Sequence, residues 1–126
     1  MRAETLDDLQ VWQRAKGLVE AVSAVTGGGR VGRNDRLRSQ IDDAVDSVLS
    51  NIAEGFGQAT DRAFARYLYI ARGSANEASS HLAVAAARGL VDQATAASLT
   101  QEATEIARML SGLIRYLLRS DWKDRF

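Results

Sequence analysis

Apolar residues recur at alternating steps of four and three positions in four successive segments of this chain, and proline is absent. Such spacing places the apolar side chains on one face of a helix. A chain without proline also carries no residue that forbids a helix. Glycines and capping residues mark the breaks between the segments. The sequence therefore predicts four helices, over residues 5–26, 34–56, 60–88 and 92–119.

The connections between these helices are short. Residues 27–33 begin with three glycines and are expected to form a flexible loop, whereas residues 57–60 and 89–92 leave room only for tight turns. Consecutive helices joined by short turns run antiparallel. We expect an all-α fold, an antiparallel up-and-down four-helix bundle that occupies residues 1–126 as a single domain. The tail from Asp121 to Phe126 is expected to fray or to dock through its two aromatic residues.

Composition excludes several classes of protein. There is no cysteine, so neither a disulfide nor a cysteine-ligated metal site can form. The 16 basic residues balance the 16 acidic ones, whereas a strongly basic chain would have indicated nucleic-acid binding. No apolar run approaches the roughly 18 residues of a membrane span, and the start does not resemble a signal peptide. These features predict a cytoplasmic protein that does not bind a membrane.

The apolar stripes are wider than one bundle requires. A helix in an isolated bundle needs about three apolar positions in seven. A surplus predicts a second buried face and therefore a homo-oligomer. Scattered apolar surface residues, which are common in monomers, are the alternative. The additional apolar positions are Trp12, Val19, Val45, Leu49, Ala107, Met109 and Ile114.

Polar residues interrupt the second and third predicted helices at positions that an antiparallel pairing would bring together. We interpret them as a layer that fixes the register of the two helices, because buried polar groups must be hydrogen-bonded. A pocket or a catalytic dyad is the alternative. The small Gly73 within this group is expected to let another backbone come close. The remaining members are Ser47, Asn51 and Glu54 in the second helix and Ser74 and Glu77 in the third.

Motifs for metal binding and catalysis are missing. A di-iron bundle needs two Glu-x-x-His pairs and two further glutamates, but His81 is the only histidine and follows Glu77 by four positions. A nucleophilic triad would depend entirely on His81. The glycines at 27–32 lack the ending of a phosphate-binding loop. We therefore predict no metal, no cofactor and no enzymatic activity; an enzyme built on Glu54, Glu77 and His81 is the weakest hypothesis.

Arginine supplies 14 of the 16 basic residues and gathers in two places. Its planar guanidinium matches the geometry of phosphate, and a symmetric oligomer would repeat such clusters into a basic band. Solvated faces paired with nearby aspartates are the simpler interpretation, which the sequence alone favours. The candidate nucleic-acid contacts are Arg30, Arg33, Arg36 and Arg38 at the start of the second helix and Arg62 and Arg66 in the third.

Three stretches, in order, resemble the motifs of a known family. Residues 9–15, Leu-Gln-Val-Trp-Gln-Arg-Ala, resemble its L-x-V-W-Q-x-A opening, and residues 47–55 resemble its S-x-x-x-N-I-A-E-G signature. Residues 64–74, together with Glu77, resemble its F-x-x-F-L-x-I-A-x-G-S-x-x-E signature. Over about residues 6–118, the chain thus resembles the 23S rRNA intervening-sequence proteins. The polar residues singled out above are the ones that carry these motifs.

This resemblance implies a four-helix bundle that assembles as a ring, typically a homopentamer, with no established enzymatic activity. Some relatives resemble accessory proteins of diversity-generating retroelements, which bind nucleic acid and a reverse transcriptase. We therefore expect a nucleic-acid-associated accessory protein that binds RNA or DNA; the alternative is a scaffold or adaptor for a protein partner.

The chain departs from the family pattern in two places. Asp42 and Asp43 stand where the family usually has a basic pair, and Leu49 stands where it often has proline. The acidic pair counts against attraction to phosphate, which scales with the number of phosphates that the protein neutralises.

Overall fold

The computed structural model describes the backbone of residues 3–124 and the side chains of residues 3–119. The expectation of docking by the aromatic side chains of Trp122 and Phe126 concerns residues outside that part. Across the described residues the chain is helical and contains no strand, which confirms the all-α class. Its elements are η1 (Leu6–Asp8), α1 (Gln10–Thr26), α2 (Gly29–Gly32), α3 (Asp35–Phe56), α4 (Asp61–Ala87) and α5 (Gln93–Asp124).

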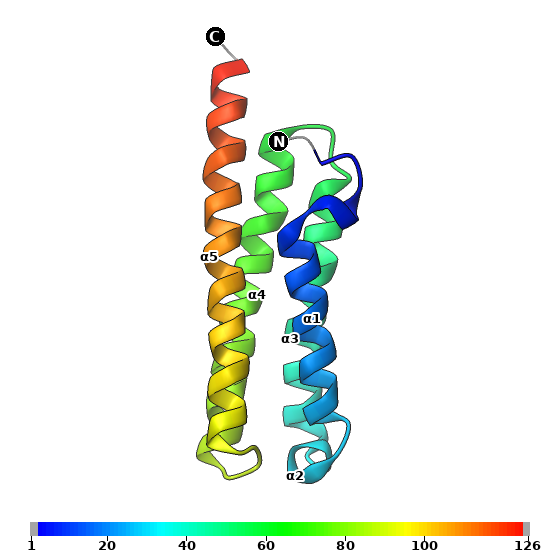
Figure 1. Cartoon of the computed structure of the whole chain (residues 1–126), viewed down its shortest axis with the longest axis vertical. Helices are drawn as coiled ribbons and strands as arrows, with labels where there is room; N and C mark the ends of the chain where they lie inside the picture. The colour runs from blue at the N-terminus through cyan, green and yellow to red at the C-terminus, as the bar shows by residue number, and fades with distance from the viewer. Residues whose placement is uncertain (1–2, 125–126) are drawn as a thin grey trace.

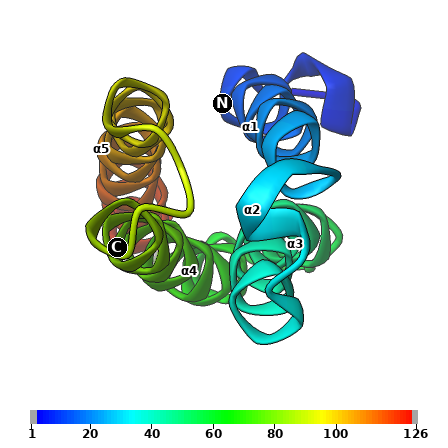
Figure 2. The same ribbon diagram turned by 90° about the horizontal axis from the view of Figure 1, so that it is seen from below.

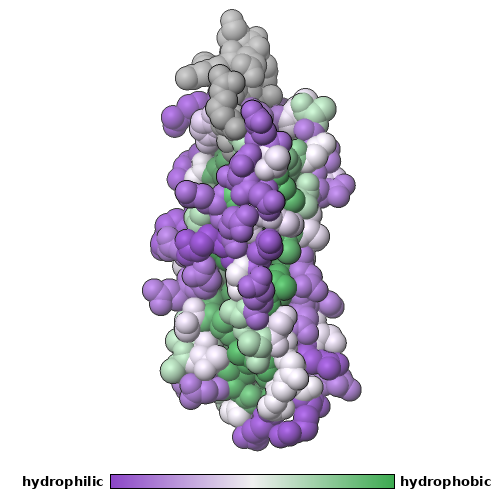
Figure 3. Space-filling model, turned by 45° about the vertical axis from the view of Figure 1, so that its right-hand side comes forward, coloured by the Kyte–Doolittle hydropathy of each residue, from purple (hydrophilic) through white to green (hydrophobic). Residues whose placement is uncertain are grey.

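The four long helices α1, α3, α4 and α5 run up and down in turn, as Figure 1 shows. Seen along the bundle axis in Figure 2, α3 lies between α1 and α4, and α4 lies between α3 and α5. Contact between α1 and α5 is the sparsest among neighbouring long helices. Charged and polar side chains cover most of the face in Figure 3, and apolar side chains reach the surface mainly in its lower half. None of the described helices is long and apolar enough to cross a bilayer.

Capping side chains begin three of the long helices at the residues that the sequence indicates. Asn34 Oδ1, Thr60 Oγ1 and Asp92 Oδ2 each accept a hydrogen bond from the backbone N–H three positions later, at 3.1, 3.1 and 3.3 Å. These acceptors satisfy donors that have no partner within the helix. After α4, Gly89 adopts a φ of 70°, a conformation that glycine permits at little cost.

The first helix and the glycine loop differ from expectation. Thr5 precedes the short η1, and α1 begins only at Gln10. Residues 27–33 are not wholly a loop, because Gly29–Gly32 form α2. The physical reason is Val31, which is only 2% exposed and anchors this turn in the core. At the other end of the chain, α5 continues beyond the expected residue 119 to Asp124.

The core runs along the bundle axis and is built from the predicted apolar stripes. Burying each large aliphatic side chain stabilises the fold by about 1.5–3 kcal/mol. Residues that lie at most 1% exposed include Leu18, Ile41, Ile52, Leu68, Leu82, Ile106 and Leu110.

The surplus apolar residues of the sequence do not form a second exposed face. Val45 and Ile114 are 2% and 3% exposed within one subunit. Trp12, Val19, Leu49, Ala107 and Met109 are half-buried and pack on the same core. The expected second apolar face was therefore wrong, because these side chains pack against the core of one bundle. The large apolar residues that remain exposed among those described are Tyr69, Ile70, Val84 and Tyr116.

An ion pair joins α1 to α5, where the helices otherwise meet least. Arg14 Nε donates to Glu102 Oε1 at 2.6 Å, and this hydrogen bond holds the pKa of the Glu102 carboxyl below its ordinary value. The two side chains are 42% and 38% exposed. Solvent therefore screens the pair, which we expect to contribute at most about 1 kcal/mol.

Replacing Glu102 with glutamine is expected to lower the free energy of unfolding by up to about 1 kcal/mol at neutral pH. Because the folded-state pKa is lowered, the contribution is complete above the ordinary carboxyl pKa of about 4.3. It disappears as pH falls through the folded-state value. Urea unfolding of both proteins at about pH 7 and pH 2.5 measures this difference. An equal deficit at both pH values would rule out the ion pair as its cause.

Candidate functional site

Three of the polar residues that the sequence singles out meet between α3 and α4. The hydroxyl oxygens of Ser47 and Ser74 lie 2.7 Å apart. Asn51 Nδ2 donates to the backbone oxygen of Ser47 at 2.8 Å and to its hydroxyl oxygen at 3.1 Å. Ser74 is 8% exposed. We call these contacts between Ser47, Asn51 and Ser74 the serine bridge, which joins the two helices at one register.

The two glutamates of the predicted cluster lie outside this bridge. Glu54 and Glu77 are both exposed. They extend in opposite directions from the serine pair along antiparallel helices, so about 15 Å of helix rise separates them. Glu77 Oε1 instead lies 3.4 Å from His81 Nε2 on its own helix. The expectation that all five polar residues cluster was therefore wrong, because a carboxylate that can reach water avoids the cost of burial.

The serine bridge is expected to stabilise the fold, and the two exposed glutamates outside it provide control substitutions. Replacing Ser74 with alanine removes one partner of the 2.7 Å hydrogen bond and is expected to lower the free energy of unfolding by about 1 kcal/mol. Glu54→Gln and Glu77→Gln, which alter exposed side chains, should each change it by less than about 0.5 kcal/mol. Chemical unfolding of the three variants measures the contrast. A larger loss with either glutamine variant than with Ser74→Ala would contradict this assignment.

The close approach of two backbones occurs at Gly55 and not at Gly73. A Cβ atom on Gly55 would lie 2.9 Å from Tyr67 Cβ and 3.1 Å from the backbone oxygen of Phe64. A Cβ atom on Gly73 would have no atom within 4 Å among the described residues. The expected role of Gly73 within one subunit was therefore wrong. From the sequence we expected Gly55 only to end the second helix. Its position four residues after Asn51 nevertheless places it on the face of α3 that packs against α4.

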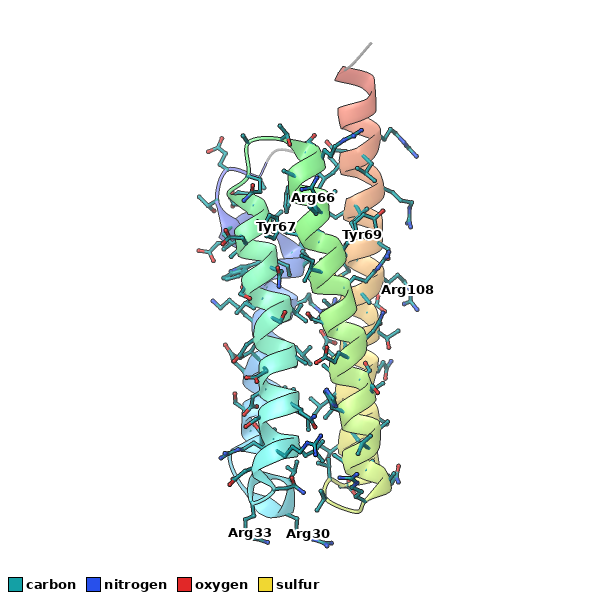
Figure 4. All side chains as sticks on the ribbon, turned by 180° about the vertical axis from the view of Figure 1, so that it is seen from behind. Arg30, Arg33, Arg66, Tyr67, Tyr69 and Arg108 are labelled. Atoms are coloured by element: carbon teal, nitrogen blue, oxygen red, sulfur yellow. The ribbon has the colours of Figure 1, made fainter. Side chains whose placement is uncertain are left out.

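The six candidate arginines divide between the two ends of the bundle. Arg30 and Arg33 lie at one end, and Arg66 lies near the other, as Figure 4 shows. Arg30 Nη1 donates to the backbone oxygen of Gly89, at the end of α4, at 3.0 Å. The stretch of α4 from Arg66 to Gly89 spans about 34 Å at about 1.5 Å per residue. The arginines of one subunit therefore form two separate groups and no continuous band.

We call the group formed by Arg30, Arg33, Arg36 and Arg38 the basic end. Arg38 Nη2 lies 3.3 Å from Asp35 Oδ1. Among the described residues, the side chains of Arg33 and Arg36 make no hydrogen bond or ion pair, and both residues are exposed. Residues 30–38 thus carry four arginines and one aspartate, a formal charge of +3 in a chain whose net charge is zero. Two of these guanidinium groups are free to bind an anion.

The outer face of α4 carries an apolar surface that the sequence did not indicate. Tyr69 and Ile70 are 46% and 49% exposed, and Val84 is 36% exposed. The exposed Gly73 lies between them along the helix. Arg72 covers part of this surface, with its guanidinium carbon 4.9 Å from the Tyr69 ring centre. The helical spacing of these residues could have revealed the surface, because Tyr69, Ile70, Gly73 and Val84 fall outside the core stripe.

The acidic pair Asp42 and Asp43 lies on α3, about one helical turn beyond Arg38 of the basic end. Asp42 Oδ1 accepts a hydrogen bond from Thr26 Oγ1 at 2.7 Å, which fixes α1 against α3. Partial burial, reinforced by the charges of Asp42 and Asp43, raises the pKa of Asp46 above its ordinary value. Within the described residues, no group of three potential metal ligands occurs here or elsewhere.

The fold and the sequence both match known proteins. Residues 7–112 match the family model described as 23S rRNA-intervening sequence protein. The chain belongs to this family. A crystal structure of a protein of unknown function from the S23 ribosomal protein family of Bacteroides thetaiotaomicron is similar, with a TM-score of 0.75 and 20% identity. The similarity covers 82% of this chain and 97% of that one, and at this identity it establishes the shared fold.

No curated protein sequence shows significant similarity to the chain. Membership of the 23S rRNA-intervening sequence family agrees with the three motifs in the sequence. The family match includes the serine bridge, Gly55 and the basic end.

Proposed function

We propose that this chain is a non-enzymatic, nucleic-acid-associated accessory protein that acts as a homo-oligomer. The observation that carries the proposal is the basic end, where Arg33 and Arg36 are exposed and have no acidic partner among the described residues. Arginine binds phosphate through paired N–H donors. The family description, which refers to 23S rRNA, supports the choice of a nucleic acid over other anions.

Self-association would repeat the basic end, which one subunit carries only once. The outer face of α4 offers Tyr69 and Ile70 as exposed apolar surface, and Gly73 leaves space for a second backbone to approach. In a ring whose axis runs parallel to the bundles, subunits that pack side by side through α4 would carry every basic end on one rim. Affinity for a polyanion rises with the number of phosphates neutralised, so repetition around the rim would strengthen binding.

Fluorescence anisotropy with a structured RNA and a DNA duplex tests the proposal across a salt series. The double variant Arg33→Gln with Arg36→Gln removes two contacts at the basic end. It is expected to reduce the slope of log K against log salt by about 2 for each participating subunit. Arg108→Gln with Arg115→Gln removes the same charge from α5 and should leave the slope unchanged.

A third double variant, Arg62→Gln with Arg66→Gln, asks whether the opposite end participates. A reduced slope of log K against log salt in this variant alone would place the nucleic-acid contact at the start of α4 and contradict the role of the basic end. Absence of binding by the unaltered protein at about 50 mM salt would reject nucleic-acid association altogether.

A protein-binding scaffold or adaptor is the second candidate. The acidic residues Asp42, Asp43 and Asp46 share one stretch of α3, and such a surface repels phosphate while attracting a basic protein partner. Affinity capture after nuclease treatment tests this candidate. A discrete protein retained by the unaltered chain and lost in Asp42→Asn with Asp43→Asn supports it. Recovery of nucleic acid alone, without a protein, counts against it.

A further inference from the structure

A cleft of about 360 Å³ opens between the start of α3 and the last turns of α4, beside the basic end. Arg36 from α3 and Arg88, which directly follows α4, contribute guanidinium groups to its walls, and Leu37 and Val84 contribute apolar surface. Leu37 is 3% exposed and belongs to the core, so this part of the cleft is held by the fold. The volume falls within the range of about 300–1,000 Å³ that is typical of small-molecule sites.

The polar groups in the cleft include several that can donate hydrogen bonds. Gln40 supplies an amide, Ser80 a hydroxyl and His81 an imidazole. Each of these groups can donate a hydrogen bond to an oxygen anion. Together with the two arginines, they provide donors from both α3 and α4. The cleft is thus equipped to surround one anionic group from two sides.

No carboxylate is among the described residues that line the cleft. Of the acidic residues near the lining residues in sequence, Asp35 pairs with Arg38 and Asp42 accepts a hydrogen bond from Thr26. Glu77 lies 3.4 Å from His81 of the cleft wall and offsets part of the positive charge there. The side chains of Arg36 and Arg88 have no hydrogen-bond or ion-pair partner among the described residues. In a chain with equal numbers of acidic and basic residues, this concentration of unpaired positive charge in a concave site favours an anionic ligand.

We propose that this cleft binds the phosphate of a nucleotide unit, with Arg36 and Arg88 on opposite sides of the phosphate. The volume accommodates more than a free ion, and Leu37 and Val84 offer an apolar surface to the attached sugar and base. The nucleotide comes either free or as part of a polynucleotide. In the second case the inference rests on the proposed nucleic-acid association and makes the cleft one of its contacts.

Isothermal titration calorimetry with the full chain tests the cleft against AMP, adenosine and the hexanucleotide hexa-adenylate. Adenosine, which lacks the phosphate, should bind at least about tenfold more weakly than AMP. Arg88→Gln should weaken AMP binding by about tenfold or more, and Arg88→Lys should weaken it less. Arg108→Gln on α5, which breaks the 2.6 Å pair with Glu105, is the control and should leave AMP binding unchanged.

The outcomes separate the two possible sources of the nucleotide. Sensitivity of both AMP and hexa-adenylate to Arg88→Gln supports a polynucleotide contact. Sensitivity of AMP alone supports a free nucleotide. Equal affinities for adenosine and AMP, or binding of AMP that Arg88→Gln leaves unchanged, would overturn the proposal, as would no binding of either phosphate ligand.

The same titrations distinguish failure of the cleft from failure of the proposed function. Hexa-adenylate binding that requires Arg33 but not Arg88, without AMP binding, would overturn the cleft and leave the basic end as a nucleic-acid contact. AMP binding that requires Arg88, in a protein that binds no RNA or DNA, would support the cleft and reject nucleic-acid association. Circular dichroism of each variant verifies that the helices remain intact.

Discussion

Replacing Gly55 with leucine is expected to lower the free energy of unfolding by about 3 kcal/mol. A Cβ atom at this position would lie 2.9 Å from Tyr67 Cβ and 3.1 Å from the Phe64 backbone oxygen. Both atoms belong to rigid parts of α4, so the two helices must separate to admit the side chain. The edge-to-face contact of Phe56 with Phe64, with ring centres 6.0 Å apart, would be lost in the process.

Gly73→Leu is the matched control for this substitution. The same change on α4 meets no described atom within 4 Å of its Cβ, and leucine favours a helix over glycine by up to about 0.8 kcal/mol. We therefore expect a stabilised monomer. Guanidinium unfolding at low protein concentration compares the two variants. Equal losses at both glycines would contradict the placement of the close approach at Gly55.

Leu68→Ala is expected to cost about 2–5 kcal/mol, the range for removing a fully buried leucine side chain. Leu68 is 0% exposed on α4, the helix that packs against both α3 and α5. The cavity would therefore lie where two helix pairs share one core. Thermal and chemical unfolding measure the loss.

Ile70→Ala, two positions along the same helix, is the control for Leu68→Ala. Ile70 is 49% exposed, so its truncation should change the stability of the monomer by less than about 0.5 kcal/mol. If α4 mediates self-association, the variant should instead weaken assembly at high protein concentration. A loss of monomer stability as large as that of Leu68→Ala would show that Ile70 is buried in the subunit.

Much of the fold could be predicted because the spacing of apolar residues and the positions of capping residues indicated the same helices. The four-three spacing of apolar residues located the long helices, and Asn34, Thr60 and Asp92 located three of their beginnings. The glycine-rich connection was misjudged because one buried side chain, Val31, outweighed the flexibility of its neighbours. Local composition cannot reveal such an anchor, since the surface that buries it comes from distant segments.

The candidate site was only partly predictable for a related reason. Ser47, Asn51 and Ser74 fell on facing helices, and a short hydroxyl or amide needs a partner at close range. Helical spacing placed Glu54 near the face of α3 that carries Ser47 and Asn51. The glutamate side chain is longer than those of serine and asparagine, so its carboxylate can reach water. The cleft was not foreseen at all. Arg36 and Arg88 are far apart in sequence, and only the antiparallel pairing of α3 and α4 brings them to one cavity.

Sedimentation of the freshly purified protein, recorded at both 260 and 280 nm, tests most directly whether this chain assembles and associates with nucleic acid. We predict a species several times heavier than the 13.7 kDa subunit. It should carry excess absorbance at 260 nm that about 1 M salt removes, because salt competes for phosphate contacts. A 13.7 kDa particle at high protein concentration, with the absorbance ratio of protein alone, would contradict it.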